Sequence, residues 1–228
     1  RFVGCMKHII ILCSITFLFI SNKYIAQDDY VNENVFHYSD WNYKTNIQTV
    51  QLHESSFDAN PAILELNSDN LLELSFDDLD FDKKNYSISF EHCTANWESP
   101  NLMPTEFING FFEANILNFT FSTNTIQKYT HYSITFPQAN INFTKSGNYI
   151  VYVYQDNDKE KLILTKRFMI FENKVTLLAT TRQAMGNDEQ YEKQHIDFSI
   201  LNSNYELTNP FTDLKVIITQ NNRWDNAV

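Results

Sequence analysis

Three aspartates near the middle of the chain have a spacing that can bind a metal ion. Asp78, Asp80 and Asp82 stand at alternate positions, so their carboxylates could converge as hard oxygen ligands on one calcium ion. A calcium loop of the EF-hand type counted from Asp78 would need glycine at its sixth position and glutamate at its twelfth, but Lys83 and Ser89 stand there. The pattern therefore favours an acidic, solvated turn over a metal site, and no cofactor is expected.

A carboxylate, an imidazole and a thiol follow one another at Glu91, His92 and Cys93. Together they could supply a nucleophile with its base, or two ligands of a metal ion. Neighbouring residues of a strand point to opposite faces, so His92 and Cys93 would not reach the same ion or substrate. We therefore expect Cys93 to be a buried core thiol beside a hydrogen-bonded histidine.

The remaining candidates for catalysis are isolated. The serines occur in no G-x-S-x-G turn, and the other histidines have no H-x-x-x-H spacing; four of them stand singly, at His37, His53, His131 and His195. We assign no catalytic residue, and the chain is not expected to be an enzyme.

The composition excludes several classes of protein. The 228 residues include 17 Lys and Arg against 28 Asp and Glu, a net charge of −11 that would repel the phosphates of a nucleic acid. Only 4 glycines and 5 prolines are present, which argues against glycine-rich phosphate loops and low-complexity linkers. Hydrophobic residues make up 43% and aromatic residues 15% of the chain, enough apolar material for a folded core.

The amino-terminal residues have the layout of a secretory signal, predicted to span residues 1–26. Residues 1–5 precede the first methionine, Met6, and are interpreted as an over-extended reading frame or a fragment edge. Lys7 follows, then the apolar run Ile9–Ile20 and a small residue, Ala26. The run is shorter than the roughly 20 apolar residues of a membrane-spanning helix, although an uncleaved anchor remains the alternative.

Removal of this segment would change the charge and the cysteine count. It would leave 14 basic residues against 28 acidic ones, a net charge of −14, with Cys93 as the last of the 3 cysteines. The exported protein would then form no internal disulfide and would not span a membrane.

The elements that carry these residues are predicted to be strands, because apolar residues recur with a period of two. Eleven segments fit, around residues 46–52, 62–66, 71–76, 86–90, 118–122, 132–136, 149–154, 162–171, 175–180, 196–200 and 214–219. Residues 105–115 are the one weak candidate for a helix.

The turn signals group these strands into two all-β modules. Ser146–Tyr149 is typical of a tyrosine corner, in which a tyrosine hydroxyl bonds back to the chain in an immunoglobulin-like sandwich. We predict a linker or flexible start over 27–45, an immunoglobulin-like antiparallel β-sandwich over 46–172, and the start of a second, truncated β domain over 173–228.

Several blocks of sequence resemble a known family, the plug protein of the type IX secretion system of Bacteroidota. The similarity runs in order from about Asn46 to the last residue; one departure is Phe81, which stands where the family often has glycine. The blocks are Leu74–Asp80, Asn85–Ser87, Phe90–Trp97, Phe107–Glu113, Tyr129–Tyr132, Phe136–Pro137, Ser146–Tyr149, Leu164–Met169, Asn209–Val216 and Asn222–Asn226.

The resemblance implies a non-enzymatic periplasmic protein at the inner face of the outer membrane. Its partner would be the outer-membrane barrel translocon, whose periplasmic opening it would close when no substrate passes. Two alternatives stay open: a periplasmic or surface glycan-binding sandwich, which needs an exposed row of aromatic rings, and a hydrolase whose active site lies outside this sequence.

Four aromatic residues between the predicted strands are candidates for an interface: Trp97, Phe107, Phe111 and Phe112. They would form either a cap on the sandwich or a docking surface for the partner. Aromatic side chains on a covered loop usually belong to the core, which favours the cap.

Overall fold

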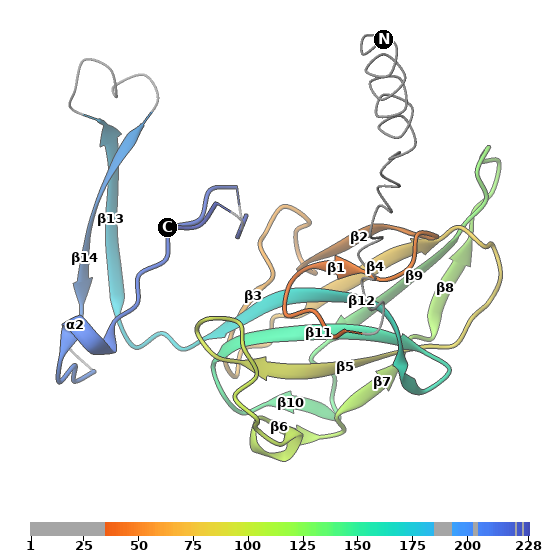
Figure 1. The fold of residues 1–228 in the computed structure, drawn as a ribbon, viewed down its shortest axis with the longest axis horizontal. Helices are drawn as coiled ribbons and strands as arrows, with labels where there is room; N and C mark the ends of the chain where they lie inside the picture. The colour runs from red at the N-terminus through yellow and green to blue at the C-terminus, as the bar shows by residue number, and fades with distance from the viewer. Residues whose placement is uncertain (1–34, 185–192, 203–204, 222, 225) are drawn as a thin grey trace, which may run out of the picture. The chain divides into compact units, whose positions relative to one another are not determined.

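The computed structural model describes residues 35–184, 193–202, 205–221, 223–224 and 226–228 (Figure 1). The predicted signal segment, residues 1–26, lies outside them. Strands dominate the described residues, and the expected all-β fold is confirmed. No helix in this part of the chain has the length and apolar character that a membrane crossing requires.

Two antiparallel sheets form the body of the first module. The larger sheet has the order β1 (Trp41–Asn42), β12 (Asp158–Phe171), β11 (Gly147–Gln155), β5 (Tyr86–Cys93) and β7 (Glu113–Asn115), with β3 (Ile63–Glu65) also paired to β12. The smaller sheet has the order β2 (Ile47–Glu54), β4 (Leu72–Asp78), β9 (Thr130–Phe136) and β8 (Asn118–Phe121). A short pair, β6 (Ile108–Gly110) with β10 (Ile141–Phe143), and the 3₁₀ turn η1 (Pro104–Glu106) lie beside them.

Aromatic rings from the two sheets meet in one core. Phe90 of β5 lies 5.1 Å from Phe136 of β9, and Tyr86 of β5 lies 5.3 Å from Phe76 of β4, measured between ring centroids. All four side chains are at most 2% exposed. Such offset and edge-on ring pairs add to the free energy of burial and fix how the two sheets stack.

The predicted tyrosine corner is present. The hydroxyl of Tyr149, at the start of β11, donates a 2.7 Å hydrogen bond to the carbonyl of Lys145 while its ring is fully buried. The two strands that follow form a hairpin, because β11 and β12 pair antiparallel from Gly147 with Ile170 to Gln155 with Asp158.

The amino-terminal part of the module is fastened to its last strand. Trp41 of β1 pairs with Thr165 of β12. The Thr165 hydroxyl also donates to the carbonyl of Ser39 at 2.7 Å, and the Arg167 main-chain N–H donates to the Asp40 carboxylate at 2.9 Å. Hydrogen bonds between residues more than 120 positions apart in the sequence thus close the sandwich.

Several details differ from the sequence-based expectation, among them β1, which lies within the predicted linker or flexible start 27–45. Residues 214–219 are not a strand, because in the described residues they pair with no strand; Ile218 exchanges two main-chain hydrogen bonds with Val228, and an isolated bridge follows between Gln220 and Arg223. Residues 105–115 contain β6 and β7 rather than a helix. β3 pairs with β12 in parallel, within an otherwise antiparallel sheet.

Residues 173–228 form a separate pair of strands and one helical turn. β13 (Thr176–Gln183) and β14 (Gln194–Leu201) pair antiparallel, and α2 (Pro210–Asp213) follows, capped by the Asn209 side chain. Apolar side chains of the pair are exposed, among them Leu177 at 60% and Phe198 at 42%. The half-buried alternation expected of β14 is therefore present at Ile196 and Ile200 but not at Phe198.

Candidate functional site

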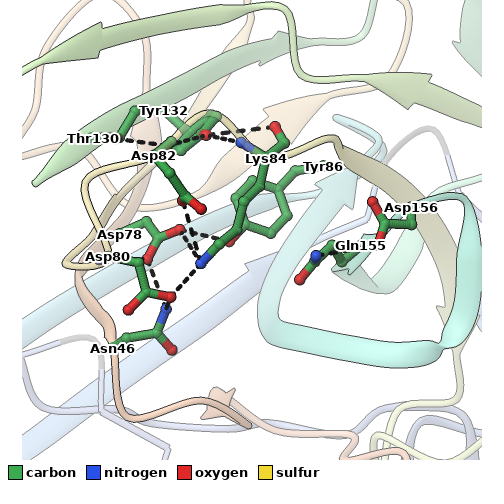
Figure 2. Close-up of polar contacts among 10 residues, drawn as sticks. All are labelled: Asn46, Asp78, Asp80, Asp82, Lys84, Tyr86, Thr130, Tyr132, Gln155 and Asp156. Carbon is green, nitrogen blue, oxygen red and sulfur yellow. Dashed lines mark hydrogen bonds and ion pairs between the residues drawn. The ribbon is translucent and has the colours of Figure 1, made fainter.

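The three aspartates of the metal-like motif surround a lysine of the same loop. Asp78 ends β4, and the chain then crosses through residues 79–85 to β5 in the opposite sheet. Figure 2 shows the Lys84 ammonium pointing between the carboxylates of Asp78, Asp80 and Asp82. Its nitrogen lies 2.9 Å from Asp78 and 3.6 Å from Asp82, and it also bonds to Asp80. The chain's own cation thus lies at the point where the three carboxylates converge.

Asp78 is fully buried and satisfied by neighbours from three segments. The Tyr86 hydroxyl donates to one oxygen at 2.9 Å, while the Asn46 amide donates to the other at 2.7 Å. The main-chain N–H of Asp80 donates to the same second oxygen at 3.1 Å. Each donor favours the ionised carboxylate, so Asp78 joins the start of β2, the crossing loop and β5.

The other side of the crossing loop, residues 79–85, is bonded to β9. The Tyr132 hydroxyl accepts from the Lys84 N–H at 2.8 Å, and the Thr130 hydroxyl donates to the Asp82 carbonyl at 2.9 Å. Phe81, at the tip, has a φ of 55°, a conformation that glycine adopts without steric cost. The loop thus keeps a left-handed turn with phenylalanine in place of glycine.

The pKa shifts in this cluster each favour the protonation state that the group has at neutral pH. Burial alone would raise the pKa of Asp78, but the hydrogen bonds from Lys84, Asp80, Tyr86 and Asn46 outweigh it and hold the pKa below its usual value. Burial alone would lower the pKa of Lys84, yet Asp80 and Asp78 hold it above its usual value. Burial, together with Asp78, raises the pKa of Tyr86. The cluster is arranged to hold fixed charges and not to exchange protons near neutral pH.

These shifts predict a pH window of stability. Because the pKa of Asp78 is lowered on folding, its contribution is present above about pH 4 and lost as the solution becomes more acidic. The raised pKa values of Lys84 and Tyr86 have the opposite consequence: their contribution is present below about pH 10 and lost above it. Urea unfolding over a series of pH values should show a plateau between these limits. Asp78→Asn should flatten the acid limb relative to Asp156→Asn, an exposed control; equal slopes in the two variants would contradict the assignment.

His92 and Cys93 face opposite sides of β5, as predicted. The His92 ring packs 4.9 Å from Tyr149 and 5.8 Å from Phe107, on the core side. Cys93 is 2% exposed in a separate cluster with Trp97 and Ile150. Burial and the nearby Glu91 carboxylate raise the pKa of the thiol to about 12, so it stays protonated and is no nucleophile at neutral pH.

The four aromatic interface candidates differ in how far their side chains are buried. Trp97 is 6% exposed and Phe107 is 0% exposed, and Phe112 packs partly buried against the main core. Phe111 differs, with 63% of its surface exposed. A partner could reach Phe111, whereas Trp97 and Phe107 serve the packing of the sandwich and contribute no exposed row of rings that a glycan would need.

The Trp97 ring packs against a guanidinium group and a second indole ring. The Arg167 guanidinium lies 4.4 Å from the Trp97 ring, and the Trp224 ring approaches Trp97 edge-on at 5.0 Å. Arg167 in turn donates to the carbonyl of Tyr38. This stack joins the Thr94–Glu98 turn to β12 on the outer face of the larger sheet.

One exposed aromatic edge was not singled out in the sequence. Leu117 is 82% exposed where the chain passes from β7 to β8, and Phe121 at the end of β8 is 46% exposed. Phe81 lies 5.3 Å from Phe121 between ring centroids. The period-two pattern indicated the strand correctly, but periodicity cannot show that a strand lies at the edge of its sheet.

These features define the class of the protein: an all-β sandwich with an aromatic core, in which a lysine neutralises the aspartates of the loop that joins the two sheets. The family model described as "Type 9 secretion system plug protein 1st domain" matches residues 47–172, more than half of the chain. The chain therefore belongs to the type 9 secretion system plug protein family, and this membership supports a role related to type IX secretion in the cell envelope.

A solved structure supports the fold over most of the chain. The crystal structure of a hypothetical protein from Parabacteroides merdae ATCC 43184 matches 85% of this chain with a TM-score of 0.79 and 29% identity. The match covers 49% of that protein, so this chain spans about half of its length. No curated protein matches the sequence significantly.

A second solved structure is a much weaker match. It is the alkylpurine DNA glycosylase AlkC of Pseudomonas fluorescens bound to DNA containing an abasic site analogue, with a TM-score of 0.28 and 8% identity over 55% of this chain and 30% of that one. At that score it carries no argument about fold or function.

Proposed function

We propose that this protein is a non-enzymatic periplasmic component of type IX secretion that closes the periplasmic opening of the outer-membrane barrel translocon. The observation that carries the proposal is the family match, because it coincides with the two-sheet body described above. Blocking a wide aqueous opening requires a stiff body with a broad surface, and stacked sheets with an aromatic core supply that stiffness.

The internal chemistry supports an obstructing role over a catalytic one. The Asp78 carboxylate is neutralised by Lys84, and the pKa of the Cys93 thiol is raised to about 12. Both groups are thereby used within the fold, and neither is presented to a substrate. This use of charged and nucleophilic groups is typical of a structural part, which acts by occupying space.

Electrical recording on the purified translocon would test the proposal. Channels are reconstituted in a planar bilayer, and the mature protein is added to the periplasmic side. We expect saturating protein to abolish most of the open-channel conductance and dilution to restore it. Unchanged conductance would overturn the proposal. Binding to polysaccharide, without binding to the translocon, would instead support the glycan-binding alternative.

A further inference from the structure

One edge of the smaller sheet lacks the irregularity that interrupts its opposite edge. At the far edge, β2 contains an irregularity between Gln48 and Gln51, with Thr49 at a φ of 52°. In the larger sheet, β12 is covered by β1 and β3. β8 pairs with β9 without interruption from Asn118 to Phe121, and no strand of the described residues pairs with its other side. Bulges and covering strands are the usual means of blocking an edge.

The main-chain groups that β8 leaves open can be assigned from its register. The Ser122 N–H donates to the Tyr129 carbonyl at 2.9 Å, next to the pair of Phe121 with Thr130. In an antiparallel pair, the main-chain N–H and C=O groups of successive residues point alternately toward the partner strand and away from it. The main-chain groups of Asn118 and Thr120, like those of Ser122, therefore point toward β9. The N–H and C=O groups of Phe119 and Phe121 therefore point to the open edge.

The composition of this edge favours strand addition. The segment 116–122 contains no charged residue and no proline, and it is rich in β-branched and aromatic residues. Phe119 and Phe121 share one face of β8, with ring centroids 5.7 Å apart. The Phe119 ring centroid also lies 6.0 Å from that of Tyr132, a buried core residue. A further strand would extend this pattern, with apolar side chains inward and polar side chains outward.

The charges beside the edge indicate which strand fits. The Lys83 ammonium lies 4.9 Å from the Phe119 ring, and the Lys128 ammonium lies 5.1 Å from the Phe81 ring. Neither forms an ion pair with the residues that the structure describes. A second copy of the chain would bring the same two cations against themselves, whereas a segment with carboxylates would pair with them.

We propose that the open edge of β8 binds an extended, acidic polypeptide segment of a partner as an added strand. The main chain of that segment would pair with Phe119 and Phe121, and its carboxylates would approach Lys83 and Lys128. This goes beyond the proposed closing of the translocon and does not depend on it, because it concerns only the kind of segment that this edge accepts.

The test uses the mature protein and two synthetic peptides of alternating valine and threonine, one ending in glutamates and one in lysines. Amide resonances and hydrogen exchange are followed by NMR. With the glutamate peptide we expect the Phe119 and Phe121 amides to shift and to exchange more slowly, while the Asn118 and Thr120 amides are protected throughout. Affinity for the lysine peptide should be at least about tenfold lower.

Two variants of one residue separate main-chain pairing from ring contact. Phe121→Pro removes the outward N–H without removing a bond to β9, whereas Phe121→Thr removes only the ring. Their melting temperatures should be similar, and the proline variant should bind the glutamate peptide at least about tenfold more weakly. Should the proline variant fail to fold, the charge reversal Lys83→Glu with Lys128→Glu provides the same test and should invert the peptide preference.

Three results would overturn the inference. One is no change at the Phe119 and Phe121 amides with the glutamate peptide. Another is equal affinity of the two Phe121 variants or, if the charge reversal is used, an unchanged peptide preference. The third is a dimer of the wild-type chain that the proline variant abolishes, which would assign the edge to a second copy.

Discussion

Replacing Lys84 by methionine should lower the free energy of unfolding by about 3 kcal/mol. The change removes the ammonium that lies 2.9 Å from Asp78, a carboxylate with no exposed surface. An unpaired buried charge is strongly destabilising, and the remaining donors, Tyr86, Asn46 and the main-chain N–H of Asp80, neutralise no charge. Urea unfolding at pH 7, monitored by tryptophan fluorescence, measures the loss.

Two further variants control for the Lys84 result. Lys161→Met removes a lysine whose partner, Asp156, lies 3.5 Å away with both side chains about half exposed, and it should cost less than about 1 kcal/mol. The double variant Asp78→Asn with Lys84→Met removes both charges and should recover part of the loss. A Lys84→Met variant as stable as Lys161→Met would show that the cluster does not hold the two sheets together.

Phe107→Ala should lower the free energy of unfolding by about 3 to 5 kcal/mol, because it leaves a cavity in the packed core. The Phe107 ring is fully buried and lies 5.9 Å from Tyr149 and 5.8 Å from His92. The same urea unfolding experiment measures this change. The urea concentration at the midpoint should fall, while the dependence of the unfolding free energy on urea concentration should stay the same.

Phe111→Ala is the matched control for Phe107→Ala, four residues along the same segment. Because Phe111 is 63% exposed, its removal should change the free energy of unfolding by no more than about 0.5 kcal/mol. If the translocon contacts this segment, Phe111→Ala should weaken that binding while stability is preserved. Equal destabilisation by the two variants would contradict the division of this segment into a buried and an accessible ring.

Local patterns predicted much of the fold. The period of two located most strands of the sandwich, and the position of Tyr149 after a Ser-Gly-Asn turn predicted its hydrogen bond to Lys145. These features depend on neighbours within a few residues, which a sequence displays directly. The short strands β6 and β10 were not predicted, because three residues carry too little periodicity.

Features that depend on distant contacts could not be predicted. Asn46 reaches Asp78 from 32 positions away, so the sequence could not show that the acidic loop is neutralised and bonded to the start of β2. The lysine at position 84 was the available signal, since it lies two positions after Asp82, the last of the three aspartates. Residues 214–219 had the pattern of a strand, but a pattern does not supply the neighbouring strand that pairing needs.

The bonds that join Ser39 and Asp40 to Thr165 and Arg167 determine the order in which the module can assemble. A chain that emerges amino-terminus first must keep its first strand unpaired until β12 has followed, more than 120 residues later. Closure is therefore a late event, since so long a loop must be ordered before its ends gain their contacts. Until then the apolar faces of the two sheets cannot be fully covered, so a partly assembled module is more prone to aggregation than the closed sandwich.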